Sequence, residues 1–260
     1  MHLIDTHVHL DLDAFDPDRP AVLDRACAAG VYELVLPGVT RARWPDIDVL
    51  HREHEGLHVA YGLHPIFLCD HADEDLDALE TWLDTHPETV AVGEIGLDGF
   101  RKDLDWERQW RYYTRQLAIA RERDLPVIIH SRRALDEVLK GLRQHPGLTG
   151  ILHAFIGSPQ QARQAADMGL CLGIGGPVTY ERAKKLHRVV REAPLEALVV
   201  ETDAPDQPLA GHQGERNEPA MTAEVNRQLA NLRDMDPADM AIITSQNARR
   251  ALRLPTGPDA

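Results

Sequence analysis

Two histidines near the start of the chain have the spacing of metal ligands. His7 and His9 close an apolar run that is typical of a strand, with the sequence IDTHVH at residues 4–9. Residues two apart on a strand point to the same side, and neutral imidazole is the commonest side-chain metal ligand. The pair therefore predicts half of a metal site, with a polar strand end as the alternative interpretation.

Later runs of the same kind carry four more potential ligands near their ends, namely Glu94, His130, His153 and Asp203. Glu94 stands among valine, glycine and isoleucine, where a carboxylate without a cation would be costly. A carboxylate can also bridge two cations about 3.5–4 Å apart. We expect a first metal to be held by His7, His9, Glu94 and Asp203. Glu94 is then expected to bridge to a second metal, held by His130 and His153.

Two further carboxylates stand on the same strand ends. Asp98 follows Glu94 by four residues, and Glu201 precedes Asp203 by two. We expect structural places for both, with Asp98 at the start of a helix and Glu201 pointing outward. A ligand role is the alternative for each.

Eight apolar runs of strand type recur along the chain, and helix-like sequence follows each. The runs cover residues 3–8, 33–39, 58–63, 90–96, 126–131, 150–155, 170–176 and 197–203. Residues 219–252 read as two helices, the second starting at Asp236-Pro237. This alternation predicts an α/β fold, a (β/α)8 TIM barrel, whose catalytic residues come from the C-terminal strand ends. A doubly wound open sheet is the alternative, and the chain lacks the GxGxxG or P-loop sequence that would support it.

The barrel is expected to form one domain over residues 1–254, with 255–260 as a flexible C-terminal tail. The chain has a net charge of −14, which argues against general binding of duplex nucleic acid. Its three cysteines are scattered, there is no apolar run long enough to span a membrane, and the first strand leaves no room for a signal peptide. These features predict a cytoplasmic protein, taken as a monomer without an obligate protein partner.

The chain resembles the TatD family of metal-dependent hydrolases, within the amidohydrolase-like superfamily, and most closely the YjjV branch. The resemblance rests on IDTHVHLD at residues 4–11, GLHP at 62–65, GEIGLD at 93–98, PVIIHSR at 126–132, HAFIGS at 153–158 and ETDAP at 201–205. The family commonly has cysteine where Val8 stands, a position that should point away from the metals.

The resemblance implies a binuclear centre of two divalent ions (Mg, Mn or Zn) and deoxyribonuclease activity of the 3′–5′ exonuclease type. The family's ligands fall on the same six residues as the spacing argument. The hypothesis is phosphodiester hydrolysis by metal-activated water, with Asp203 and Glu94 as the catalytic carboxylates. His64 and Arg132 are candidate substrate contacts, and the acidic charge favours a small or single-stranded nucleic acid.

Three other functions are compatible with such a site. An amidohydrolase could cleave a small ester, amide or phosphotriester, although many such enzymes bridge their metals with a carbamylated lysine, and the fourth strand offers Glu94 and no lysine. Hydrolysis of an aminoacyl-RNA ester is a second possibility. A non-catalytic metal-binding protein is the third, and the complete ligand set argues against it.

Overall fold

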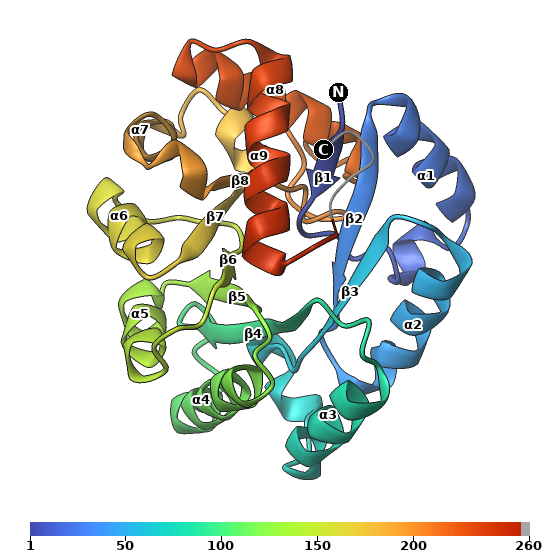
Figure 1. Cartoon of the computed structure of the whole chain (residues 1–260), viewed down its shortest axis with the longest axis vertical. Coiled ribbons are helices and arrows are strands. Elements are labelled where there is room, and N and C mark those ends of the chain that lie inside the picture. Colours follow the sequence, from blue (N-terminus) through green and yellow to red (C-terminus); the bar gives the residue numbers. More distant parts are fainter. Residues whose placement is uncertain (256–260) are drawn as a thin grey trace.

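In the computed structural model, which describes residues 1–255, eight parallel strands form one sheet in the order of the chain (Figure 1). They are β1 (Leu3–Asp5), β2 (Val31–Pro37), β3 (Leu57–Tyr61), β4 (Ala91–Asp98), β5 (Val127–Arg132), β6 (Gly150–Leu152), β7 (Leu170–Ile174) and β8 (Leu198–Val200). A hydrogen bond from the N–H of Thr6 to the carbonyl of Val200, 3.1 Å long, joins the first strand's end to the last. The predicted TIM barrel is confirmed, and the open sheet is wrong.

Helices alternate with the strands and form an outer ring (Figure 1). Within the described residues the α-helices are α1 (Arg19–Ala28), α2 (Trp44–Glu53), α3 (Glu74–Thr85), α4 (Trp106–Glu122), α5 (Leu135–Gln144), α6 (Pro159–Asp167), α7 (Lys184–Glu192), α8 (Thr222–Arg233) and α9 (Pro237–Leu252). Short 3-10 helices are η1 (Asp13–Phe15), η2 (Arg41–Arg43), η3 (Pro65–Asp70), η4 (Gly176–Thr179), η5 (Leu195–Ala197) and η6 (Pro219–Met221). No helix among the described residues is long and apolar enough to cross a membrane.

The last helix begins where the sequence predicts. The side chain of Asp236 accepts a hydrogen bond of 2.7 Å from the N–H of Ala238, and Pro237 occupies the first helical position. Both features favour a helix start, because the first turn has free N–H groups that proline does not need to pair. Of the predicted tail, residues 256–260 lie outside the described residues.

The hydrophobic core has an inner and an outer part. Inward-facing residues of the strands, among them Ile4, Val35, Ile128 and Val199, pack inside the barrel with Leu252 of α9. Helix α9 crosses in front of the strands in Figure 1, and its final turns cover the barrel interior. The outer part fills the space between the sheet and the ring of helices. The barrel is thus a packed body, and its polar chemistry lies at one end.

Several strands end earlier than the sequence predicts. β1 ends at Asp5 and β8 at Val200, so the segments that follow them are loops. These loops still run side by side: Val8 and Ala204 form a parallel bridge, and the N–H of Asp203 donates to the carbonyl of His7 at 2.9 Å. Val8 is buried, as expected for a residue that points away from the metals.

Asp5 ties the two loops together. Its carboxylate accepts hydrogen bonds from the N–H and hydroxyl of Thr202, at 3.0 and 2.6 Å, and from the Thr222 hydroxyl at 3.0 Å. It also accepts the N–H of His7 at 3.2 Å. All of these groups are buried, so each donor replaces water that the carboxylate has lost. One side chain therefore sets the positions of both loops.

We predict that replacing Thr222 with valine lowers the free energy of unfolding by about 1–3 kcal/mol, because a buried carboxylate oxygen loses one of its donors. Denaturant unfolding of the purified protein measures this. Thr81→Val is the matched control: the Thr81 hydroxyl bonds only a carbonyl of its own exposed helix turn. Equal stability of the two variants would contradict the role given to Asp5.

Candidate metal centre

The predicted ligands gather at the C-terminal ends of the strands. His7, His9 and Asp203 lie on the loops after β1 and β8, and His153 follows β6. Glu94 and His130 lie within β4 and β5; His130 pairs with Gly96, and the register of the two strands shifts between Val92 and Ile95, beside Glu94. Six residues that are far apart in the sequence therefore meet at one mouth of the barrel.

Four donor atoms face one another around the first expected metal position. Nε2 of His7 lies 3.2 Å from Nε2 of His9 and 3.1 Å from Oε2 of Glu94. Oδ1 of Asp203 lies 3.7 Å from the His7 nitrogen and 3.6 Å from the His9 nitrogen. Two donors bound to one zinc at about 2.0–2.2 Å can stand no more than about 4.4 Å apart, so these separations fit a shared cation.

The other oxygen of Glu94 faces a different pair of histidines. Oε1 lies 3.1 Å from Nδ1 of His130 and 3.1 Å from Nε2 of His64. The N–H of Ile66 donates to Nδ1 of His64, so the neutral ring carries its proton on Nε2 and donates it to Glu94. His64 thus orients the carboxylate, while a nitrogen of His130 is available to a cation.

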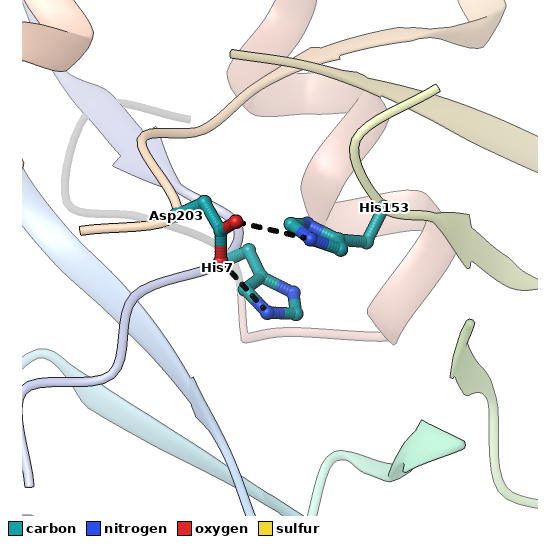
Figure 2. A group of neighbouring side chains, drawn as sticks. All are labelled: His7, His153 and Asp203. Atoms are coloured by element: carbon teal, nitrogen blue, oxygen red, sulfur yellow. Dashed lines mark ion pairs between the residues drawn. The ribbon is translucent and has the colours of Figure 1, made fainter. Parts of the chain in front are cut away.

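His153 lies beside two of the ligands expected for the first metal. It is expected to share the second metal with His130, and in the structure its ring also stacks on His7, with centroids 3.5 Å apart. Its Nε2 lies 3.6 Å from Oδ2 of Asp203, and Figure 2 shows both histidines pointing at that carboxylate. His7 thus belongs to two groups of close donor atoms, one with His153 and Asp203 and one with His9 and Glu94, while Glu94 also groups with His130 and with His64, which donates a hydrogen bond to it.

The predictions that Asp98 starts a helix and that Glu201 points outward are wrong. Asp98 is the last residue of β4, and α4 begins later, at Trp106. Its Oδ2 lies 3.2 Å from Nε2 of His130, and its Oδ1 accepts the N–H of Phe100 at 2.8 Å. A carboxylate that takes one ring nitrogen of a histidine fixes the ring and leaves the other nitrogen for a metal.

Glu201 points into the barrel and is fully buried. Its Oε1 accepts the N–H of Ala154 at 2.6 Å and lies 3.0 Å from Nδ1 of His153. A Cβ at Gly173 on β7 would stand only 2.1 Å from the Glu201 carboxylate, so glycine provides the space. The sequence hides this arrangement, because whether a residue at a strand end points in or out depends on a one-residue shift.

The carboxylates of the site are anionic despite their burial. Burial opposes ionisation, but His64, His7 and His130 hold the pKa of Glu94 well below its usual range. Likewise, His153 and His9 overcome burial and hold the pKa of Asp203 well below normal. Burial would lower the pKa of His9, but Asp203 and Glu94 raise it to about 9.

This charge pattern suits divalent cations. Buried carboxylates hold protons on neighbouring imidazoles, and a metal that binds the same nitrogens releases those protons. Nδ1 of His7 and Oε2 of Glu201 are buried without a hydrogen-bond partner among the described residues. Imidazole nitrogen with carboxylate oxygen is a donor set that zinc, manganese and related ions accept.

Arg132, a predicted substrate contact, lies at the rim of the mouth. Its guanidinium stands over the Phe100 ring, 3.8 Å from the centroid, and the side chain is exposed. Sequence reasoning missed Phe100 itself and two other exposed apolar residues that follow strands, Phe67 and Ile156. The signal was available: large apolar side chains in the segments between β3, β4 or β6 and the α-helix that follows.

Comparisons with known proteins agree with this fold and site. A family model described as TatD related DNase matches residues 4–253, a range that includes every residue of the centre. The uncharacterized metal-dependent hydrolase YjjV of Escherichia coli is 43% identical over 238 residues, covering 91% of this chain and 92% of the relative. Its crystal structure superposes with a TM-score of 0.94 at 40% identity, over 97% of this chain and 98% of the other.

A second relative has a more specific name. A protein of Rahnella called 3′-5′ ssDNA/RNA exonuclease TatD is 33% identical over 261 residues, which is 95% of this chain and 97% of that protein. Both relatives match over nearly the whole barrel. The chain belongs to the TatD family of metal-dependent hydrolases.

Proposed function

We propose that the protein hydrolyses phosphodiester bonds of single-stranded nucleic acid, removing nucleotides from the 3′ end of DNA. The observation that carries this proposal is the divided carboxylate of Glu94, whose two oxygens face different histidines. Such a carboxylate suits a pair of cations, the arrangement that phosphatases and nucleases use on phosphate esters. The Rahnella relative, named as an exonuclease for single-stranded DNA and RNA, supports the same substrate.

The residues of the centre have distinct parts in this reaction. His7, His9, Glu94, His130, His153 and Asp203 would hold the two divalent cations. When bound, these ions supply Lewis-acid polarisation of the phosphoryl oxygen and lower the pKa of water towards about 7. The donor set of imidazole nitrogens and carboxylate oxygens is compatible with magnesium, manganese or zinc.

Asp203 is the proposed base. The Nε2 group of Gln207 donates to its Oδ2 at 2.5 Å, while its Oδ1 faces the two histidines that follow β1. The carboxylate is therefore fixed in orientation, and its low pKa keeps it ionised at neutral pH. It accepts the proton of the attacking water and passes it towards solvent at the mouth. His64, which donates to Glu94, stands where it can also contact the substrate phosphate.

The rim of the mouth favours a single strand. Phe67, Phe100 and Ile156, which follow β3, β4 and β6, are 37%, 42% and 70% exposed, and two of the three are aromatic rings. Unpaired bases stack on such rings, whereas a duplex keeps its bases inside. Arg132 and Arg133 both lie over the Phe100 ring and supply positive charge beside it. This local charge matters because the chain as a whole carries −14.

The test is loss of nucleotides from end-labelled single-stranded DNA with added magnesium or manganese. We expect stepwise shortening from the 3′ end, and a fall of at least about 100-fold in Glu94→Gln, since groups that merely orient a ligand already cost 10- to 100-fold. Glu107→Gln, on the exposed side of α4, is the matched control. Equal inactivity of wild type and Glu94→Gln would remove the DNA assignment and leave the metal-dependent hydrolase without a substrate.

We predict that Glu201→Gln weakens metal binding by about 10- to 100-fold, because His153 loses the carboxylate that orients it. Chelator competition followed by elemental analysis measures this. The control is Glu215→Gln, which alters an exposed carboxylate 2.7 Å from Nδ1 of His212. Unchanged affinity in Glu201→Gln would mean that His153 does not depend on its buried partner.

We predict that Phe100→Ala weakens binding of single-stranded DNA by about 5- to 150-fold, the equivalent of one stacked base at 1–3 kcal/mol. Hydrolysis of bis(p-nitrophenyl) phosphate, which carries no nucleobase, should keep its rate. Tyr32→Ala, at an equally exposed ring near the start of β2, serves as the control. A parallel loss on both substrates would argue against stacking.

A further inference from the structure

A second group of potential ligands lies outside the barrel mouth. Asp48 lies midway along α2, His86 directly follows α3, and Glu88 stands in the loop that leads to β4. Each offers one donor atom, and these atoms all lie within 4.8 Å of one another. The group belongs to the ring of helices, where α2 and α3 are neighbours (Figure 1), and the loop before β4 is at the opposite end of the strands from the mouth.

The carboxylate of Asp48 is only half satisfied. Its side chain is nine-tenths buried, and its Oδ2 pairs with the guanidinium of Arg52 at 2.9 Å. The other oxygen, Oδ1, is buried without a hydrogen-bond partner among the described residues and lies 4.0 Å from Nε2 of His86. A buried carboxylate oxygen without a hydrogen-bond donor costs desolvation free energy. A positively charged partner would offset this cost.

His86 presents an acceptor to that oxygen. Its Nδ1 lies 2.8 Å from the carbonyl of Trp82, which can only accept, so Nδ1 carries the proton of the neutral ring. The Thr85 hydroxyl beside it has the same carbonyl as its own acceptor, at 3.0 Å. Nε2 of His86 therefore holds a lone pair, and it faces the lone pairs of Asp48. Two acceptors 4.0 Å apart are too distant for a hydrogen bond, but a cation bound to both at about 2.0–2.2 Å spans the gap.

Two more unpaired groups lie against the same place. The hydroxyl of Tyr61 and Nε1 of Trp82 lie next to each other, and in the part of the chain that the structure describes both are buried without a well-formed hydrogen bond. Burial raises the pKa of Tyr61, and the nearby carboxylates of Asp48 and Glu88 raise it further. Both groups are hydrogen-bond donors, so they suit a water molecule or a carboxylate oxygen on a cation. The Trp82 ring also stacks on His86, with centroids 4.0 Å apart.

We propose that Asp48, His86 and Glu88 bind a divalent transition-metal ion of the zinc class, separate from the centre at the barrel mouth. One imidazole nitrogen and two carboxylate oxygens form three ligands, and water completes the coordination next to Tyr61 and Trp82. The ion would connect α2 to the end of α3 and to the start of β4. It therefore has a structural role and takes no part in hydrolysis.

His145 follows a helix end with the same backbone conformation as that of His86, so the two histidines can be compared. It directly follows α5, with φ −125° and ψ 64°, while His86 has φ −126° and ψ 72°. Its Nδ1 lies 3.0 Å from the carbonyl of Gly141, four residues back, as Nδ1 of His86 lies near Trp82. Proline follows both histidines. The local conformation therefore accounts for Nδ1 of His86 and leaves its Nε2 to the metal.

The test counts zinc bound to the full chain. Protein stripped by a chelator is dialysed against a fixed concentration of free Zn²⁺, and zinc per chain is measured by elemental analysis. His86→Gln should bind one zinc fewer than wild type, while His145→Gln should match wild type. Hydrolysis with added manganese should be equal in all three proteins, because the mouth is untouched. Equal zinc content in His86→Gln and wild type would overturn the proposal.

A second variant distinguishes loss of the metal site from misfolding of the protein. Glu88→Gln leaves the end of α3 intact at a partly exposed position and should also lose one zinc. Co²⁺ provides a local probe, since a paramagnetic ion bound to His86 quenches the stacked indole of Trp82. Quenching present in wild type and His145→Gln, but lost in both His86→Gln and Glu88→Gln, supports the site. Quenching that persists in the folded Glu88→Gln protein, with unchanged zinc content, excludes it.

Discussion

The structure depends on keeping a carboxylate charged inside a protein. Burial alone raises the pKa of a carboxyl group, as it does for Asp11 close to the site. Glu94 is equally buried, yet its pKa falls because imidazoles surround both of its oxygens. Hydrogen-bond donors and positive charge must therefore reach the centre of the barrel from several strands at once. The convergence of histidines on or after β1, β3 and β5 on one residue of β4 is the consequence, and the same negative charge suits a bound cation.

That convergence requires a closed barrel with its last loop fixed to its first. A parallel sheet has no turn that joins its outer strands, so closure depends on contacts between residues nearly the whole chain apart. Asp5 provides them through Thr202 and Thr222, and the carbonyl of His7 accepts the N–H of Asp203. Two of the candidate ligands, His7 and Asp203, are thus held by the same hydrogen bonds that close the barrel.

The sequence predicted the barrel and the convergence of the six candidate ligands, because period-two spacing at His7 and His9 and a charged residue inside the apolar run at Glu94 are strong local signals. It did not predict that His153 would stack on His7, since that depends on how far β6 extends: the strand ends at Leu152, earlier than expected. The inward direction of Glu201 was missed for the same reason. The pairing of Asp98 with His130 depends on the register of β4 and β5, which no single stretch of sequence encodes.

The group of Asp48, His86 and Glu88 could not be predicted from the sequence, for a different physical reason. His86 and His145 follow helices of similar type and precede proline, so local sequence makes them equivalent. They differ only in what the neighbouring helix presents: α2 places the free oxygen of Asp48 opposite His86. A ligand set drawn from two helices and a loop has no periodicity of its own. It becomes visible through unsatisfied buried atoms, and this criterion also marks the centre at the mouth, where Nδ1 of His7 and Oε2 of Glu201 have no partner among the described residues.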